Sequence, residues 1–336
     1  MDIQYVCPKC HSPLVIHNNL KYLCSKDCNN SKCNTEYEIL NDIPRFTEIS
    51  NYANNFGYQW NKFDDTQIDN RKTRKLELSK DRLFYQGDWD PADLSNLNIL
   101  EVGSGAGRFS EVILSNTNAN LYSIDYSNAV EANSKNNFSG NQDRFFLSQA
   151  SVYEMPFPNN SFDKVFCFGV LQHTPSFDES IKALISKAKI GGEIVVDFYR
   201  IKGWWTKIHA KYFLRPFTKN IPDRRLLSLI ENNIDWLIKI SDILNKFGLH
   251  FLTRFLPIVD IKTTFPKDLS TKERREWAIL DTFDMFSPEH DHPQSFSSVE
   301  SMFKKHNCEI TFSGIVNMPD GFKSNVVRAI KKIDVT

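Results

Sequence analysis

The sequence predicts an α/β protein with a seven-stranded, mostly parallel sheet. Short apolar runs alternate with amphipathic stretches from Leu97 onward, which is the pattern of strands buried between two layers of helices. Three of the thirteen glycines stand together at positions 103, 105 and 107, where a strand would turn into a helix. Five of the seven cysteines fall within the first 33 residues, so we expect a separate small unit in front of the sheet.

Composition and charge exclude several classes of protein. With 336 residues, of which 41% are hydrophobic and 13% aromatic, the chain can bury a large core, and disorder is excluded. Lys plus Arg (41) equals Asp plus Glu (41), so no global field favours nucleic acid or a membrane. No apolar run approaches the ~18 residues of a membrane-spanning helix, and the first residues do not have the pattern of a secretory signal. We therefore expect a cytoplasmic protein.

The N-terminal cysteines predict a structural zinc site. Cys7 and Cys10 have the two-residue spacing with which one tight turn directs two thiolates at one ion. Cys24 and Cys33 are the favoured second pair, with Cys28 in an enlarged loop, and Cys28 in place of either is an open alternative. Since a unit of about 45 residues has too little core to fold without a staple, four thiolates that close the coordination sphere would stabilise it.

The alternating pattern defines the elements of the predicted sheet. The expected strands cover residues 98–102, 121–125, 144–147, 163–168, 193–198, 309–312 and 325–330, and the expected helices cover 108–115, 127–136, 178–189 and 298–306. The chain is thereby divided into a zinc ribbon (1–48), an N-terminal extension that caps a ligand site (49–96), a core (97–200), a mainly helical insertion on the substrate side (201–296) and a C-terminal completion of the sheet (297–336).

The turn after the first central strand is suited to a ligand. Gly103, Gly105 and Gly107 allow a sharp turn with a ligand against the backbone, and the following helix presents free N–H groups at its start. Asp125 ends the next strand, where a carboxylate accepts hydrogen bonds from a ribose diol. Because this glycine spacing is tighter than the dinucleotide fingerprint, no pyrophosphate needs to be held.

Residues 97–200 resemble the class I S-adenosylmethionine-dependent methyltransferases. The glycine-rich run from Glu101 to Gly107, the acid Asp125, the turn at 155–157 and the segment 169–173 occur in that family's order. The resemblance implies a Rossmann-like fold and an enzyme with S-adenosyl-L-methionine as its cofactor.

The resemblance also implies which residues meet the cofactor. They are Glu101, Gly103, Ser104, Gly105 and Gly107 around the methionine moiety, Asp125 at the ribose, Ser151 and Val152 at the adenine, and Tyr126 and Phe168 beside them. Ser151 stands where the family has an acid near the adenine amine, so that hydrogen bond is expected to be weaker or lost.

The ribbon carries a resemblance of its own. Residues 37–46 resemble the end of the small zinc-ribbon proteins that activate tRNA and translation-factor methyltransferases, and similar ribbons are fused in front of bacterial methyltransferases. In related fused enzymes an element upstream of the core folds over the cofactor. Gln59 and Trp60 are therefore expected to close the methionine end, although an aromatic anchor between ribbon and core is equally compatible with them.

Three side chains are candidates for general acid–base catalysis. His173 follows the fourth strand, where cofactor and acceptor meet in this fold, and ordering of that loop is its alternative role. Asp284 and His290 lie in residues 277–294, a stretch with four carboxylates and two imidazoles that we expect beside the reactive methyl group.

Residues 200–225 predict a contact with an anionic partner. They hold eight Lys and Arg against one acid, interleaved with aromatic residues, which suits an anionic lipid or membrane surface, a lipid-linked phosphate or RNA. A solvated face over an aromatic core is the alternative.

The predicted function is methyl transfer to a small molecule or glycan, such as a surface-polysaccharide sugar or its lipid-linked precursor. An RNA methyltransferase acting on rRNA or tRNA is the alternative, and the neutral charge balance makes nucleic acid the less favoured partner. A non-catalytic module that binds the cofactor and a protein partner is a further alternative.

Overall fold

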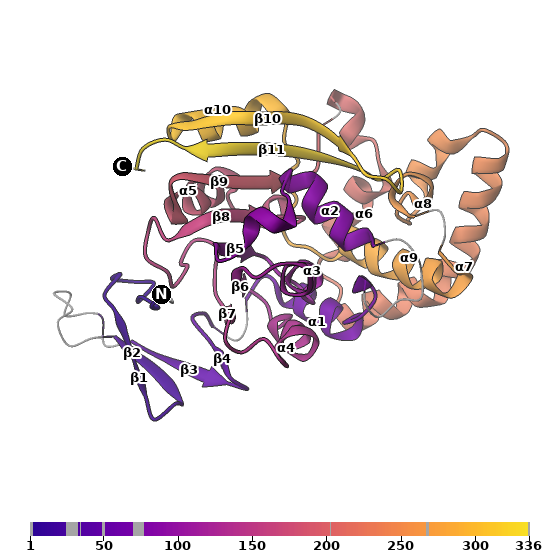
Figure 1. Cartoon of the computed structure of the whole chain (residues 1–336). Helices are drawn as coiled ribbons and strands as arrows, with labels where there is room; N and C mark the ends of the chain where they lie inside the picture. The colour runs from indigo at the N-terminus through magenta and orange to yellow at the C-terminus, as the bar shows by residue number, and fades with distance from the viewer. Residues whose placement is uncertain are drawn as a thin grey trace.

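The computed structural model describes residues 3–24, 33, 35–48, 51–69, 77–201, 203–266 and 269–334. Figure 1 shows three parts side by side: a small sheet near the N-terminus, a large sheet covered by helices, and a helical unit at the far side. Among the described helices, none has both the length and the apolar character that crossing a bilayer requires.

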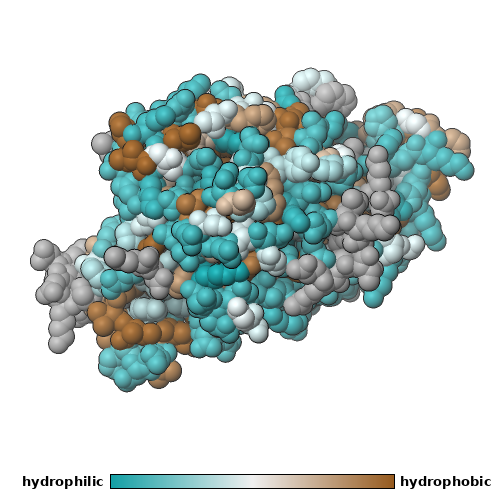
Figure 2. Space-filling model, viewed as in Figure 1, coloured by the Kyte–Doolittle hydropathy of each residue, from teal (hydrophilic) through white to brown (hydrophobic). Residues whose placement is uncertain are grey.

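The small sheet is the predicted ribbon. Its four antiparallel strands are β1 (Leu14–His17), β2 (Lys21–Cys24), β3 (Glu36–Leu40) and β4 (Ile43–Pro44), in that order. Hydrophobic residues gather over the ribbon in Figure 2. Two of its exposed side chains are Ile16 and Leu20, which are 49% and 68% accessible.

The ribbon is fastened to the edge of the large sheet. The Phe46 amide donates to the Gln149 carbonyl at 2.8 Å, so the chain after β4 extends the sheet by one bridge. The ring of Tyr5 packs on Phe46 and Phe157 with centroids 5.1 and 5.6 Å apart. The ribbon thus shares an apolar cluster with the sheet and does not depend on its own small core alone.

The large sheet has the predicted seven strands. They are β5 (Asn98–Val102), β6 (Asn120–Asp125), β7 (Phe145–Gln149), β8 (Phe162–Cys167), β9 (Ala188–Asp197), β10 (Cys308–Asn317) and β11 (Lys323–Lys331). Their order is β10-β11-β9-β8-β5-β6-β7, with β5 to β9 parallel and β11 antiparallel to both of its neighbours. This is the Rossmann-like arrangement that the sequence predicts, and the strand order reverses beside β5, where ligands bind in such sheets.

Helices cover both faces of this sheet. One face carries α5 (Phe177–Lys187) and α10 (Phe296–Lys305), and the other carries α2 (Leu78–Gly87), α3 (Arg108–Asn116) and α4 (Val130–Asn137). Neighbouring strand residues such as Ile99 and Leu100 are both fully buried but belong to opposite apolar clusters. This two-sided burial explains why the strands have continuous apolar runs in the sequence.

The strands β9 and β10 exceed their predicted lengths the most. β9 begins at Ala188 instead of residue 193, because Ala188 already pairs with Phe162 before a register shift carries the ladder past the glycine pair. The helix before it accordingly ends at Lys187. β10 extends to Asn317 instead of residue 312, since it pairs with β11 along its whole length.

The helical unit contains η4 (Gly203–Lys207), α6 (Ala210–Thr218), α7 (Asp223–Lys246), η5 (His250–Phe255), α8 (Ile261–Thr264) and α9 (Thr271–Phe286). It has an apolar cluster of its own, in which Ile230 and Ile234 of α7 join Phe283 of α9. The same cluster includes Phe63 and is contacted by Trp60, so the unit also rests on α1 (Asn54–Lys62). This contact joins the helical unit to the segment that precedes the sheet.

Candidate active site and cysteine cluster

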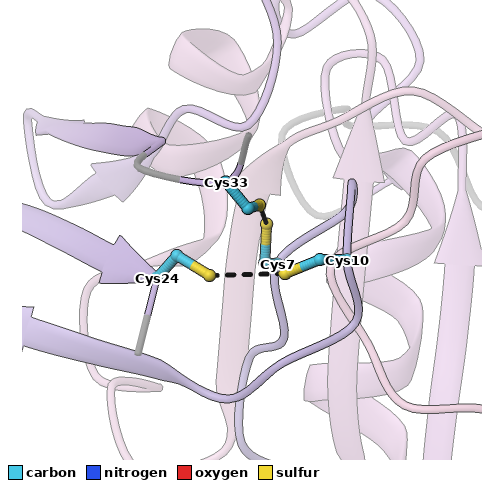
Figure 3. A group of neighbouring side chains, drawn as sticks. All are labelled: Cys7, Cys10, Cys24 and Cys33. Carbon is cyan, nitrogen blue, oxygen red and sulfur yellow. Dashed lines mark hydrogen bonds between the residues drawn. The ribbon is translucent and has the colours of Figure 1, made fainter. Parts of the chain in front are cut away.

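Four ribbon cysteines converge at one point. The sulfur atoms of Cys7, Cys10, Cys24 and Cys33 all lie within 4.8 Å of one another, with Cys7 to Cys33 and Cys10 to Cys24 each 3.3 Å apart (Figure 3). Four sulfurs around a tetrahedral zinc ion with ~2.3 Å bonds would be ~3.8 Å apart, so this donor set fits zinc after a small adjustment. Cys28, the alternative ligand, lies outside the described residues.

The cluster is formed by the expected local structure. The amide of His11 donates to the carbonyl of Cys7 at 2.8 Å, which closes the tight turn between the first two cysteines. Cys24 ends β2, and Cys33 is buried beside Cys7 before β3 begins. Among the described cysteines, Cys24 and Cys33 join Cys7 and Cys10 in the group.

The three glycines after β5 are required by their surroundings. Gly103, Gly105 and Gly107 all have positive φ, at +81°, +52° and +84°. A Cβ on Gly103 would lie 2.2 Å from the Val170 side chain, and one on Gly105 would lie 3.2 Å from the indole of Trp60. Trp60 of α1 therefore lies directly over the turn, at the carboxyl end of the central strand.

Two carboxylates flank this turn. Asp125 ends β6, and its two oxygens accept the Gly105 amide at 2.9 Å and the Ser127 amide at 2.8 Å. Glu101 lies within β5, and one of its carboxylate oxygens accepts hydrogen bonds from the hydroxyls of Ser110 and Ser123. Burial raises the pKa of Glu101 to about 7.

Several buried polar atoms around the turn await a partner. Within the described part of the chain, both amide atoms of Gln59, the hydroxyl of Ser104 and the second oxygen of Glu101 make no hydrogen bond. Leaving such groups unpaired costs about 1–3 kcal/mol each. A ligand with an amino group and a carboxylate, such as the methionine moiety of the cofactor, has the donors and acceptors that would satisfy them.

Aromatic side chains stand beside the predicted ribose and adenine positions. Tyr126 follows Asp125, and its ring packs on Tyr52 with centroids 4.9 Å apart. Ser151 and the buried Val152 follow the end of β7. The sequence analysis missed Tyr52, although a tyrosine in the segment upstream of the core was a signal for it.

Phe168 lies differently from the other predicted cofactor contacts. Its side chain is buried, with its ring 5.4 Å from Phe109 and 5.2 Å from Phe166. Phe168 therefore belongs to the core between the sheet and α3, and a contact with the cofactor would be made by its backbone.

His173 and Asp284 lie together. His173 is buried in η3 (Leu171–His173), and its Nδ1 is 3.1 Å from the carbonyl oxygen of His290. A carbonyl only accepts, so Nδ1 carries the hydrogen and Nε2 keeps its lone pair. That Nε2 has no hydrogen-bond partner among the residues described and is 3.9 Å from Asp284 Oδ2. Burial lowers the pKa of His173, while the nearby Asp284 carboxylate opposes the shift.

The third catalytic candidate, His290, makes a different contribution. Its backbone carbonyl fixes the His173 ring, whereas its own ring lies 5.3 Å from Tyr52 and 5.8 Å from His292. The structure thus brings His173 and Asp284 together, whereas the ring of His290 faces Tyr52.

Tyr199 adds a group that the sequence analysis did not select. Its hydroxyl donates to Asp284 Oδ2 at 3.1 Å, and its ring lies edge-on to His173 at 5.6 Å. Tyr199 comes two residues after the end of β9, next to the strand that precedes His173, so its place at the end of a parallel strand was the available signal.

A buried ion-pair group lies next to this cluster. Asp291 is 2.9 Å from Lys211 and 3.1 Å from Arg215, both on α6. Burial opposes ionisation, yet the Lys211 ammonium holds the pKa of Asp291 below its usual range. Two of the eight cations in residues 200–225 are therefore paired inside the protein, so only the remaining cations of the segment could contact the predicted anionic partner.

Residues 100–196 match the family model of the methyltransferase domain. A curated relative, the tRNA U34 carboxymethyltransferase of Shewanella frigidimarina (strain NCIMB 400), is 30% identical over 112 residues, which are 33% of this chain and 34% of that protein. The tRNA U34 carboxymethyltransferase of Nautilia profundicola (strain ATCC BAA-1463 / DSM 18972 / AmH) is 29% identical over 113 residues, 33% of this chain and 37% of that protein. The chain spans about a third of the length of these curated relatives.

Among solved structures, magnesium protoporphyrin IX methyltransferase (ChlM) from Synechocystis PCC 6803 with bound SAH is 15% identical, with a TM-score of 0.45, and the match covers 83% of this chain and 96% of that chain. The strand order and the glycine turn agree with the family match. Residues 100–196 therefore form a methyltransferase domain with the Rossmann-like sheet.

Proposed function

We propose that the protein transfers a methyl group from S-adenosylmethionine to a hydroxyl group of a small molecule or glycan. The observation that carries this proposal is the unpartnered, buried Nε2 of His173 beside Asp284. A hydroxyl acceptor must lose its proton during transfer, so it needs a base at the acceptor position. An imidazole with a lowered pKa and a fixed tautomer is suited to that task.

The cofactor would supply an electrophilic methyl group on a sulfonium. Glu101 would accept from its amino group, and Asp125 would accept from the ribose hydroxyls in the spare lone pairs of its oxygens. Ser151, Val152 and Tyr126 would surround the adenine. Residues 49–96 would act as a cap, with Gln59 and Trp60 closing the methionine end; the contact of Trp60 with Gly105 supports this role.

The acceptor would be held by His173. The 3.9 Å separation of His173 Nε2 and Asp284 Oδ2 is too long for a direct hydrogen bond, so Nε2 would be left to accept the single hydrogen of an acceptor hydroxyl whose oxygen lies ~2.8 Å away. His173 would take that proton while the hydroxyl oxygen receives the methyl group that the cofactor supplies. Asp284, held by Tyr199, would stabilise the resulting imidazolium. Alignment of these groups supplies most of the acceleration.

The ribbon would bind one structural zinc ion through Cys7, Cys10, Cys24 and Cys33. We expect native mass spectrometry to find one zinc per chain and Cys33→Ser to lose it, with a fall in the thermal midpoint. Cys308→Ser removes a buried thiol outside the cluster and should keep the metal. Retention of zinc in Cys33→Ser would point to Cys28 as the fourth ligand.

An acceptor of the glycan class is supported by the Asp284 carboxylate and the Tyr199 hydroxyl at the acceptor position. A lipid-linked precursor of such a glycan would be held at a membrane surface, the partner that residues 200–225 predict. Incubation with radiolabelled S-adenosylmethionine and fractionated cell extract tests the substrate class. We expect label in a glycan or small-molecule fraction with the wild type and much less with His173→Ala.

RNA methylation is the second candidate, and the curated tRNA-modifying relatives favour it over the shared 112 residues. Label in the RNA fraction, with binding to bulk RNA that weakens steeply as salt rises, would replace the glycan proposal by this one. Binding of S-adenosylmethionine without any labelled product would instead support a non-catalytic module.

A further inference from the structure

Helix α6 exposes large apolar side chains to the surface and buries a charged one. Phe213, Leu214 and Phe217 lie on one side of the helix, at i, i+1 and i+4, and Phe213 and Phe217 are 61% and 74% exposed. The side chains that α6 buries include the guanidinium of Arg215, which is held by Asp291 and by the carbonyl of Pro288. A helix on a water-exposed surface normally turns such residues the other way.

Neighbouring segments extend this apolar surface. Trp204 of η4, six residues before α6, is 71% exposed. η5 lies against the start of α6, because the Arg254 side chain donates to the Ile208 carbonyl at 2.5 Å, and it exposes Phe251 and Phe255. We call the exposed side chains of Trp204, Phe213, Leu214 and Phe217 the aromatic face.

The chain segment that carries the aromatic face has Lys and Arg but no acid. Residues 198–222 contain no Asp or Glu and six Lys or Arg. Lys211 and Arg215 are held inside by Asp291, whereas Lys207 and Lys219, just beyond the two ends of α6, are exposed. Exposed aromatic residues with Lys at their margin are the features with which a short helix lies in the interface of an anionic bilayer.

We infer that the aromatic face binds the surface of an anionic lipid bilayer, with the apolar side of α6 in the headgroup region and Lys207 and Lys219 on the lipid phosphates. Aromatic side chains that project together from one helix side match a continuous apolar layer. This inference does not rest on methyl transfer. It does place His173, Asp284 and Tyr199 close to the bilayer, because the ammonium of Lys211 on the same helix lies 4.9 Å from the centroid of the Tyr199 ring.

The test is co-sedimentation of the full chain with vesicles of phosphatidylcholine that contain about one third phosphatidylglycerol. The wild type should bind these vesicles, bind pure phosphatidylcholine more weakly, and lose affinity as salt rises. Phe213→Ser/Phe217→Ser should reduce the partition coefficient at least about tenfold, since two aromatic side chains no longer leave water. Lys207→Glu/Lys219→Glu should reduce binding to the anionic vesicles alone.

The matched control is Ile16→Ser/Leu20→Ser, which removes two exposed apolar side chains from the ribbon and should bind vesicles like the wild type. Calorimetric binding of S-adenosylmethionine by every variant reports whether the methyltransferase domain is folded. Equal vesicle binding by the wild type, the double Phe variant and the double Lys variant would overturn the inference. Preferential binding of the protein to bulk RNA would also overturn it. So would a concentration-dependent dimer that Phe213→Ser/Phe217→Ser abolishes, if the protein does not bind vesicles.

Discussion

The two halves of the candidate site are built in different ways. The cofactor side consists of consecutive strand ends, with the glycine turn after β5, Asp125 after β6 and Ser151 after β7. The acceptor side is gathered from η3, the end of β9, α6 and α9, over more than a hundred residues of chain. Parallel strand ends meet at one edge whatever else the protein does, whereas the acceptor side depends on how the helical unit docks. The strand ends can thus serve a common reaction, while the docked helical unit determines which substrate is accepted.

Replacing His173 gives the largest expected effect and acts on the acceptor side alone. His173→Ala should lower kcat about 10²–10⁴-fold, because the proton acceptor is lost. The Kd of S-adenosylmethionine should stay within about twofold, since the proposal assigns the His173 imidazole to the acceptor and not to the cofactor. His292→Ala, which removes an exposed imidazole nearby, is the matched control. An unchanged kcat in His173→Ala would show that His173 is not the general base.

A methyl group on the glycine turn acts on the other half. Gly103→Ala should weaken S-adenosylmethionine binding by ~30-fold or more in calorimetry, because its Cβ would meet Val170 at 2.2 Å and its φ is +81°. Gly140→Ala has the same φ with no described atom within 4 Å of its Cβ. It should lower the free energy of unfolding by about 1 kcal/mol of backbone strain and leave the cofactor affinity unchanged. Equal cofactor affinity in the two variants would contradict the tight fit at the turn.

Tyr199 tests whether the acceptor side is a connected group. Tyr199→Phe keeps the ring that packs on His173 and removes the hydrogen bond to Asp284. We expect kcat to fall about tenfold, which corresponds to one hydrogen bond to a charged group. The affinity for S-adenosylmethionine should not change, and a loss of affinity without a loss of kcat would assign Tyr199 to the cofactor side instead.

The pH profile gives the smallest and most specific effect. Burial lowers the pKa of His173, so its basic form persists below the ordinary histidine pKa of about 6.5. The rate should therefore be flat above neutrality and fall only at lower pH, as the imidazole becomes protonated. Asp284 raises this pKa, so the acidic limb of Asp284→Asn should move to still lower pH, and a move to higher pH would contradict the pairing.

The sequence predicts most of the fold and names the candidate residues of the cofactor side. The glycines and Asp125 are recognisable because each follows a short apolar run that is typical of a buried strand. Cys24 and Cys33 are favoured over Cys28 on the position of a hairpin; their sulfurs join the described cluster, while Cys28 lies outside the described residues, so that choice stays a prediction. These features are local, so their spacing along the chain determines their geometry.

The acceptor side could be predicted only in part. Asp284 and His173 were candidates, but their contact depends on the packing of α9 against the sheet, which no local pattern contains. Leu229 fits the apolar pattern of α7 and is nevertheless 52% exposed, and Phe213 and Phe217 are turned outward. Lys211 and Arg215 belong to a basic segment that appears uniform in sequence, and only the position of Asp291 distinguishes them from their neighbours.

The turn after β5 should accept a nucleoside that carries a sulfonium or thioether group rather than a two-phosphate coenzyme. Isothermal titration of the full chain with S-adenosylmethionine, S-adenosylhomocysteine and NADH measures this most directly, with Asp125→Ala as the comparison. We expect saturable binding of the first two ligands, loss of most of that affinity in Asp125→Ala, and no heat with NADH. Binding of NADH alone would show that the turn serves a different class of coenzyme.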